Sequence, residues 1–551
     1  MKGESVQKLD FSDEFLLESV ENRFQSGNFM GALTLLNKRN KMYAPSADAF
    51  ALAADIYEAM GLWRQSADAW FRFLDTCNEA DFGEGYEGLA VAFMNMGNDV
   101  QSALYYHRAL TQDGQISPDG LAEIGNLFRH VAAPKLRIVS DEEDGSELLA
   151  EGLGEFKLGN LEKAREKFSE VPEESENYPS AMGLCAMCEL MSGEEEQAQK
   201  ECEDLLERYP ENIQALTTYC AVLGARDNKE GARDVARRLY SLSTDETDDL
   251  YRIATALCET GLDQEAYEVL SRLRTRLEYD ENILWFHAVA AYRTERVDAA
   301  IQSLEILTTL YPRKAVATYY LERLRSMEED ERIRMSYYYR VPEEEYTTIA
   351  NFLLAATTID EREAQRLSEL DELDEFFRIA FDEMEGRDEK LQALAVRVAV
   401  RTHSDAVLRE VLLDGTAEEY VKILILHELT MRNSEDSFGV VVCNVYREFF
   451  THKIQIGEKK REAFMKAFAD VYAKFALLGE DNEGKICAAA EDVYDTLEEA
   501  GALDYSDERS SLAAAIYREA RLKGGERSLS QIVELFDANR YTTQCILDFM
   551  M

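Results

Sequence analysis

The chain has 551 residues, of which 46% are hydrophobic and 10% aromatic, and it contains only 8 Pro and 29 Gly. This length exceeds one ordinary hydrophobic core, so we expect several domains or a fold that grows by repetition. Asp and Glu number 107 against 60 Lys and Arg, which gives a formal charge of −47. Such a charge excludes broad binding to nucleic acids or anionic membranes, because both require a cationic surface. It permits a basic partner, and it otherwise serves solubility.

The sequence contains no segment that predicts export or membrane insertion. Residues 1–15 are polar, and there is no apolar run of about 18 residues, the length needed to span a bilayer. The nine Cys are scattered, as in reducing compartments rather than in disulfide frameworks. We therefore expect a cytoplasmic protein.

A short pattern recurs in the first part of the chain: a Gly or small polar residue at a helix turn, followed five or six positions later by Ala. The turns are at Gly27, Gly61, Gly97, Gly159, Gly193, Asp227, Gly261 and Glu295. Their successive steps are 34, 36 and 62 residues and then 34 residues four times. This spacing predicts a repeated helix–turn–helix unit.

Two further positions in each unit resemble those of the tetratricopeptide (TPR) family. Seven residues before the turn, that family has a small residue; this chain has Ala54, Ala90, Gly152, Ala186, Cys220, Ala254 and Ala288, with Val20 as the exception. Four residues earlier it has a large apolar one; this chain has Leu16, Phe50, Tyr86, Leu148, Met182, Leu216, Leu250 and Leu284. Residues at i and i+4 share a helix face, so a large and a small side chain lie one turn apart on the same face. The resemblance covers residues 14–325 and implies an all-α superhelix, a TPR solenoid.

The array is interrupted where the step lengthens to 62 residues. Residues 119–131 predict a lone helix, and the Pro and acidic residues that follow favour a connector. After Pro312, residues 315–336 predict one long helix with a charged end, which suits a terminal repeat. We therefore expect four parts: an N-terminal array of three units plus a capping helix at 1–131, an acidic connector at 132–146, a second array of five units plus a capping helix at 147–336, and a helical C-terminal domain at 337–551.

In the C-terminal domain the 34-residue spacing is lost but helical periodicity continues. We expect an irregular or HEAT-like helical domain. Its helices are expected near 343–358, 362–385, 388–401, 404–413, 417–431, 436–450, 458–478, 482–500, 506–523 and 528–550.

The last part of the chain, 513–551, partly resembles a helix-turn-helix. It departs from that pattern at Val533, Asp537 and Thr543, and its basic residues are offset by acidic ones, whereas a DNA-reading helix needs positive charge. A transcriptional regulator whose TPR arrays sense a peptide therefore stays open as the alternative function, although we do not expect nucleic-acid binding.

No cluster of residues in the sequence predicts catalysis. The only CxxC, Cys185 to Cys188, lies inside a predicted helix without the further ligands that zinc needs, so it is interpreted as packing. The six His are dispersed, and no phosphate loop or nucleophile elbow occurs. We expect no enzyme activity, no cofactor and no metal.

The resemblance implies a ligand groove lined by the first helix of each unit, here called helix A. In the first three units its positions are Glu14, Glu21, Phe24, Asp48, Asp55, Glu58, Glu84 and Glu87. An acidic groove attracts Lys- and Arg-rich segments. The Lys/Arg/Asn clamp that chaperone-binding TPR domains use for a terminal carboxylate is absent, so we do not expect chaperone-tail binding.

The second array carries an apolar and aromatic set at the same positions: Tyr251, Cys258, Trp285 and Tyr292. It suits an amphipathic helix or a hydrophobic strand. Taken together, the sequence predicts a non-catalytic scaffold or adaptor that binds protein or peptide segments in its TPR grooves. It does not predict the oligomeric state.

Overall fold

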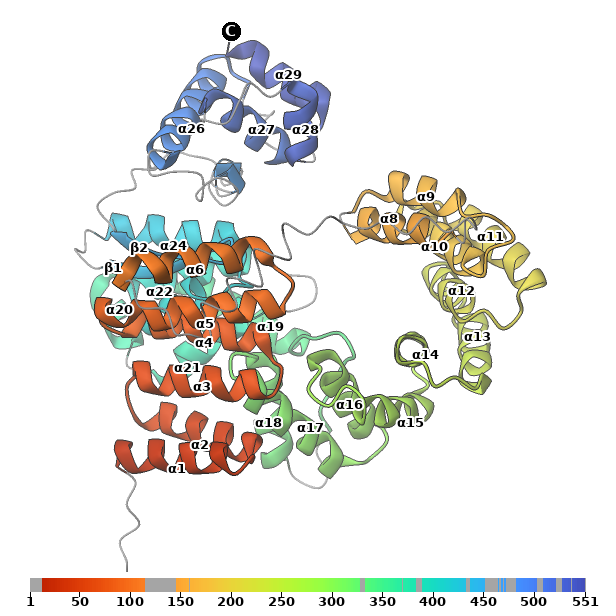
Figure 1. Cartoon of the computed structure of the whole chain (residues 1–551), viewed down its shortest axis with the longest axis horizontal. Coiled ribbons are helices and arrows are strands. Elements are labelled where there is room, and N and C mark those ends of the chain that lie inside the picture. The colour runs from red at the N-terminus through yellow and green to blue at the C-terminus, as the bar shows by residue number, and fades with distance from the viewer. Residues whose placement is uncertain are drawn as a thin grey trace, which may run out of the picture. The chain divides into compact units, whose positions relative to one another are not determined.

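The structure is a computed structural model of the whole chain (Figure 1). It describes residues 12–113, 145–157, 159–327, 332–368, 370–382, 389–432, 437–450, 464, 467–468, 470–471, 482–502, 509–521, 528–536 and 538–550. The contacts divide the chain into two compact units, one of residues 1–133 together with 343–551 and the other of residues 134–342. The expected lone helix at 119–131 and most of the connector at 132–146 lie outside the described residues. The four-part division stays a prediction.

The first unit begins with three helical hairpins. Their helices are α1 (Asp13–Gln25), α2 (Phe29–Met42), α3 (Ala47–Ala59), α4 (Trp63–Thr76), α5 (Phe82–Asn95) and α6 (Asp99–Asp113), with a 3-10 turn η1 (Glu79–Asp81) before α5. Figure 1 shows α1 to α5 as successive layers. The small positions Ala54 and Ala90 of helix A have no exposed surface, so neighbouring helices meet there. In the third unit the buried small residue of the second helix is Ser102, whereas Ala103 is exposed.

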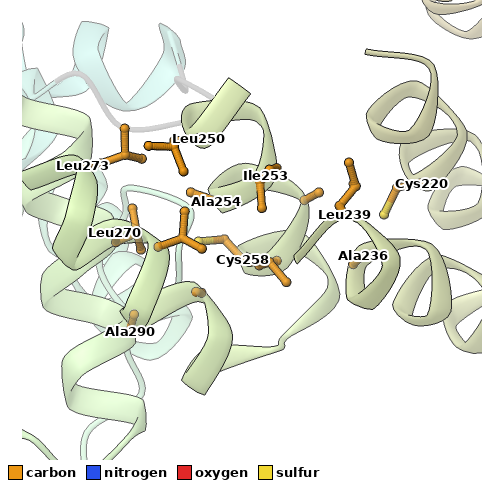
Figure 2. Packing of buried hydrophobic residues seen from close by; sticks show 14 of the residues in the cluster. Cys220, Ala236, Leu239, Leu250, Ile253, Ala254, Cys258, Leu270, Leu273 and Ala290 are labelled. Atoms are coloured by element: carbon orange, nitrogen blue, oxygen red, sulfur yellow. The ribbon is translucent and has the colours of Figure 1, made fainter. Parts of the chain in front are cut away.

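The second unit continues the same hairpins. Its helices are α8 (Ser146–Lys157), α9 (Leu161–Ser169), α10 (Tyr178–Met191), α11 (Glu195–Arg208), α12 (Ile213–Ala225), α13 (Lys229–Ser241), α14 (Thr247–Thr260), α15 (Asp263–Arg274), α16 (Glu281–Arg293), α17 (Val297–Leu310) and α18 (Ala315–Ser326). Consecutive hairpins share one apolar core, in which Leu250, Ala254 and Leu270 lie between α12–α13 and α16 (Figure 2). Each hairpin thus buries an apolar face that it cannot bury alone.

All eight predicted turn residues adopt a left-handed backbone. Six are Gly, with φ between 68° at Gly261 and 83° at Gly193, and the other two are Asp227 (φ 57°) and Glu295 (φ 63°). The left-handed region is open to Gly at no cost and strained for residues with a side chain. A recurring Gly at this position therefore allows the tight turn between the two helices of a unit to form without backbone strain.

The C-terminal part of the first unit is mainly helical, as expected. Its elements are α19 (Glu343–Ala356), α20 (Glu361–Leu367), α21 (Asp371–Phe381), α22 (Glu389–Arg401), α23 (Asp405–Leu412), α24 (Glu419–Met431), β1 (Ser437–Val442), β2 (Val445–Phe450), α26 (Asn482–Glu499), α27 (Arg509–Glu519), α28 (Leu529–Phe536) and α29 (Arg540–Phe549). The helix expected at 362–385 is two helices, and most of the one expected at 458–478 lies outside the described residues.

Two helix predictions are wrong. Where a helix was expected at 436–450, residues 437–450 form an antiparallel β-hairpin, β1–β2, because Cys443 and Asn444 both take left-handed backbone (φ 48° and 61°) and close a two-residue turn. The helix expected at 315–336 ends at Ser326, and residues 332–341 are non-helical. Tertiary contacts of these segments outweigh their local helical pattern.

The β-hairpin is bound to the second and third N-terminal units. The Tyr105 hydroxyl, fully buried on α6, donates to the Asn444 carbonyl (2.7 Å) and accepts from the Tyr446 N–H (3.0 Å). Asp75 of α4 accepts from the Gly439 N–H at 3.0 Å, and Arg108 donates to the Tyr446 carbonyl at 2.8 Å. These contacts pack the β-hairpin directly on the N-terminal array.

The turn glycines give a test of the repeat. We predict that Gly193→Ala destabilises the α10–α11 hairpin by about 1 kcal/mol, since Ala is strained at positive φ although nothing lies within 4 Å of the added methyl. The matched control is Gly154→Ala in α8, which has equally open space and an ordinary helical backbone; there Ala stabilises by about 0.5–1 kcal/mol. Hydrogen exchange of the helix amides measures both. Equal effects of the two substitutions would contradict this account of the turn.

The contact between the array and the β-hairpin gives a second test. We predict that Tyr105→Phe destabilises the first unit by about 1–3 kcal/mol, because a part-buried carbonyl and a buried N–H both lose their partner. Urea denaturation and hydrogen exchange in β2 measure the loss. Tyr338→Phe, which changes a residue that is 56% exposed, is the control and should change stability little. A Tyr105→Phe protein as stable as the control would refute the role given to this hydroxyl.

Candidate functional site

The predicted N-terminal site residues lie on α1, α3 and α5, the helix A of the first three units. Their exposed members are Glu14, Glu21, Asp48, Asp55 and Glu84, and their half-buried members are Phe24, Glu58 and Glu87. Phe24 packs against Phe29 at 5.9 Å between ring centroids, and Glu21 accepts from the Gln25 side chain at 3.0 Å. A partner can therefore reach the exposed members from solvent. Phe24 and Glu58 instead contact other side chains of their own units.

Four of these carboxylates, Asp48, Asp55, Glu84 and Glu87, form what we call the acidic face. Partial desolvation and the charges of Glu58 and Glu84 raise the pKa of Asp55 to about 6, although its side chain retains exposed surface. Desolvation raises the pKa of Glu84 too, with further contributions from Asp81, Asp48 and Glu87. These couplings mean that α3 and α5 hold like charges close together.

Glu58 is engaged elsewhere. Its Oε1 accepts hydrogen bonds from the Ser66 hydroxyl at 2.9 Å and from the Trp70 indole N–H at 3.1 Å, both on α4. Its contribution to the acidic face is therefore its charge beside Asp55, whereas its hydrogen bonds hold the α3–α4 hairpin together.

The predicted aromatic set of the second array is placed differently. Tyr251 and Tyr292 are half-buried, and Trp285 and Cys258 are buried. The Trp285 indole N–H donates to the Tyr337 carbonyl at 3.0 Å, and the Tyr292 hydroxyl accepts from the Ile333 N–H at 2.7 Å. Trp285 and Tyr292 thus contact a protein segment, and that segment is residues 332–341 of this chain.

Sequence reasoning missed three residues at this face: Asp263, Arg293 and Tyr337. The Tyr337 hydroxyl donates to Asp263 at 2.8 Å, and the Arg293 guanidinium lies 4.8 Å from the centre of the Tyr337 ring. The run Tyr337-Tyr338-Tyr339, which breaks the helical pattern, was the signal available. It was not used because the run follows the helix expected at 315–336 and was assigned to the C-terminal domain at 337–551, not to the second array.

The two residues of the CxxC are packing residues. Cys185 and Cys188 are buried free thiols, and burial raises the pKa of Cys185 to about 12 and that of Cys188 to about 11. His287 is buried as well, between the hydroxyls of Ser303 (2.8 Å) and Ser271 (3.3 Å), and burial lowers its pKa to about 4. Buried thiols held protonated in this way are poor nucleophiles, and both nitrogens of His287 are engaged by serine hydroxyls.

Among the described residues, no group of three or more His, Cys, Asp or Glu lies close enough to hold a metal ion. In the same part of the chain, no helix has both the length and the apolar character needed to cross a bilayer.

The C-terminal helices α27, α28 and α29 pack against one another. Thr543, a departure from the helix-turn-helix pattern, is fully buried, whereas Tyr541 is 76% exposed at the start of α29. Asp537, the departure at the turn, lies outside the described residues. The regulator alternative stays a prediction.

The carboxyl groups of Glu189 on α10 and Glu201 on α11 form a pair in the α10–α11 hairpin. Glu189 is 4% exposed and lies 3.8 Å from Arg165, in a hollow of about 730 Å³ that Gly193 and Glu194 also line. Burial, followed by the charge of Glu201, raises the pKa of Glu189 to about 7, against the opposing charge of Arg165. The folded hairpin therefore favours the protonated form of Glu189.

No protein-family model and no curated protein matches the sequence. Among solved structures, yeast Tom70 is 10% identical, with 97% of this chain and 96% of that chain covered and a TM-score of 0.30. The yeast Sti1 TPR2AB domain in complex with a pHSP90 peptide is 13% identical over 47% of this chain and 96% of that chain, with a TM-score of 0.21. A tetratricopeptide repeat protein from Parabacteroides merdae is 15% identical over 46% and 95%, with a TM-score of 0.23. The hairpins of this chain are TPR-like, as their 34-residue spacing and left-handed turns show.

The carboxyl pair gives a pH-dependent prediction. Because the pKa of Glu189 is higher in the folded state than its ordinary 4.5, its stabilising contribution is complete below pH 4.5 and is lost as the pH rises through about 7. Gln mimics the protonated form, so Glu189→Gln should remove this decline and stabilise the hairpin at pH 8 by about 1–3 kcal/mol.

Urea denaturation of wild type and variant at pH 5 and pH 8 measures the difference. The control is Glu196→Gln, an exposed carboxylate on the same hairpin, which should shift stability equally at both pH values. A Glu189→Gln protein less stable than wild type at pH 8 would show that the buried charge is favourable.

Proposed function

We propose that this protein is a non-catalytic scaffold that binds protein segments through its helix A surfaces, and that the acidic face binds a Lys- or Arg-rich segment. The observation that carries the proposal is the gathering of Asp48, Asp55, Glu84 and Glu87 on α3 and α5, where the pKa of Asp55 reaches about 6. Like charges held together in this way raise the free energy of the unbound state. A cation placed between them relieves that repulsion.

The exposure of the carboxylates supports binding over a purely structural role. Asp48, Asp55 and Glu84 are exposed, so a partner can reach them without rearrangement of the helices. Lys and Arg side chains bring several donors to a carboxylate, and charge-assisted hydrogen bonds are the strong ones. A segment with basic residues spaced along it pairs with both helices at once.

The test uses a fluorescein-labelled decapeptide of alternating Lys and Ala and the full chain at low salt. We predict that Asp55→Asn combined with Glu84→Gln weakens binding about tenfold, because two of the four paired charges are lost. The matched control is Asp204→Asn combined with Glu207→Gln, which changes the net charge equally on α11 and should weaken binding less than about twofold, since distant surface charges are screened. Fluorescence anisotropy measures each affinity.

The same titration at several pH values adds a second signature. Asp55 is neutral below a pH of about 6 and charged above it, so wild-type affinity should rise between pH 5 and pH 7, whereas the double variant should show a flatter profile. If both double variants lose affinity equally, the peptide responds only to net charge and the acidic face is not its site.

A further inference from the structure

Glu189 occupies a position of helix A that most other units fill with an apolar core residue. The position lies four residues before the turn, and five of the eight units have an apolar residue there that is at most 6% exposed: Tyr57, Phe93, Leu223, Leu257 and Ala291. Glu189 is buried to the same degree, with 4% of its surface exposed. A carboxyl group at a core position is unfavourable unless it is hydrogen-bonded, and such departures from a repeated pattern commonly mark functional sites.

The preceding unit shows how a carboxyl group at this position can be satisfied. There Glu155, which is half-buried, accepts a hydrogen bond from the Asn160 side-chain amide at 2.8 Å. Exactly one repeat of 34 residues after Asn160 the chain has Glu194, and an ionised carboxylate has no hydrogen to donate. The Oε2 atom of Glu189 is buried without a hydrogen-bond partner among the described residues, and so is that of Glu201 beside it. The fifth unit therefore lacks the donor that the fourth unit has.

The nearest positive charge replaces this donor only in part. Arg165 on α9, which packs against α10 (Figure 1), lies 3.8 Å from Glu189, beyond hydrogen-bond distance. The same guanidinium lies 3.4 Å from Glu194, and its side chain is 44% exposed, so water screens its attraction for either carboxylate. Glu189 is thus a buried acceptor whose charge is not fully compensated.

The hollow of about 730 Å³ that Glu189 lines has the size of a small-ligand site. Its charged lining consists of one guanidinium and four carboxyl groups, those of Glu189, Glu194, Glu195 and Glu196, so the hollow favours a cation. A metal ion would need three or more ligands within reach of one another, which the described residues do not provide. An ammonium group carries three rotatable donors and no acceptor, and so it can donate to one buried carboxylate and to others at the rim.

We propose that the hollow at the α10–α11 turn binds a primary ammonium group, which donates to Glu189 as Asn160 donates to Glu155 in the preceding unit. Both the Lys side chain of a protein segment and a free aliphatic amine carry this group. The hollow belongs to the unit of residues 134–342, whereas the acidic face belongs to the other unit, so the inference goes beyond the proposed function and does not depend on it.

Binding of a cation here is linked to the loss of a proton. Burial and the charges of Glu201 and Glu194 raise the pKa of Glu189 to about 7, against the charge of Arg165, so at pH 7 many molecules carry the proton. A bound ammonium group stabilises the ionised carboxylate and thereby releases this proton. The neighbouring thiols do not take part, because their pKa values are raised to about 12, 11 and 12 in Cys185, Cys188 and Cys202.

The test is calorimetric titration of the full chain at pH 7 with 1,4-diaminobutane and, separately, with a capped Ala-Lys-Ala tripeptide. Titrations in phosphate and in Tris, whose enthalpies of ionisation differ, give the number of protons released. We expect wild type to release roughly half a proton per ammonium group bound in the hollow. Carboxylates with ordinary pKa values are already ionised at pH 7, so weak binding to them releases none. The acidic-face variant, Asp55→Asn combined with Glu84→Gln, should release nearly as much as wild type.

Glu189→Gln should weaken binding at least about tenfold and abolish the proton release, because a charge-assisted hydrogen bond is lost. The matched control is Glu155→Gln, which removes one charge at the equivalent position of the preceding unit and should change the affinity less than about twofold. Glu194→Asn covers the case in which Glu189→Gln alters the fold. It copies the arrangement of Asn160, supplies Glu189 with a donor of the chain itself, and should also weaken binding about tenfold with an unchanged circular dichroism spectrum.

The two probes distinguish the source of the ammonium group. Proton release with both shows that the group alone is recognised; release with the tripeptide alone assigns the hollow to a protein segment, and release with the diamine alone assigns it to free amines. If wild type releases no proton with either probe, or if Glu189→Gln and Glu155→Gln bind equally well, the probes respond only to net charge and the proposal is overturned.

Discussion

The close approach of neighbouring helices at one small residue per helix A is the constraint on which both arrays depend. Gly152 gives the measure of it, because a methyl group added there would lie 2.4 Å from the Phe168 ring. At the same position Ala186 and Ala288 have no exposed surface. Where two helices meet this closely, the large residue one turn away fills the space beside the contact. Units that share this small residue therefore pack through the same position, and their stacking follows from the repetition of the sequence pattern.

This constraint is local in sequence, so the arrays could be predicted. The small residue, its large partner and the turn lie within about one helix of each other, and the 34-residue step repeats them. The acidic side chains on α3 and α5 could be placed on one face for the same reason. The raised pKa of Asp55 could not be predicted from the sequence, because it depends in part on the distance to Glu84 in the next unit.

The errors fall where distant contacts decide the local structure. Residues 437–450 contain Val440 to Val442 and a left-handed Asn444, both signals for a hairpin, but a short apolar run in a helical context fits either period. Residues 327–336 have helix-forming composition. Within this stretch, residues 332–336 are non-helical because Arg293 and Tyr320 bind the carbonyls of Met335 and Arg334, which a helix would use internally. Neither contact is visible in a single sequence.

The hydrogen bonds of Tyr105 also determine the order in which the chain can assemble during synthesis. Tyr105 and its two partners are 339 and 341 residues apart, and a ribosome adding roughly 5–20 residues per second needs tens of seconds to cross that gap. Residues 134–342 are complete before Tyr446 emerges. For that interval the N-terminal hairpins lack the β-hairpin that pairs with Tyr105, so its docking is a late step of folding.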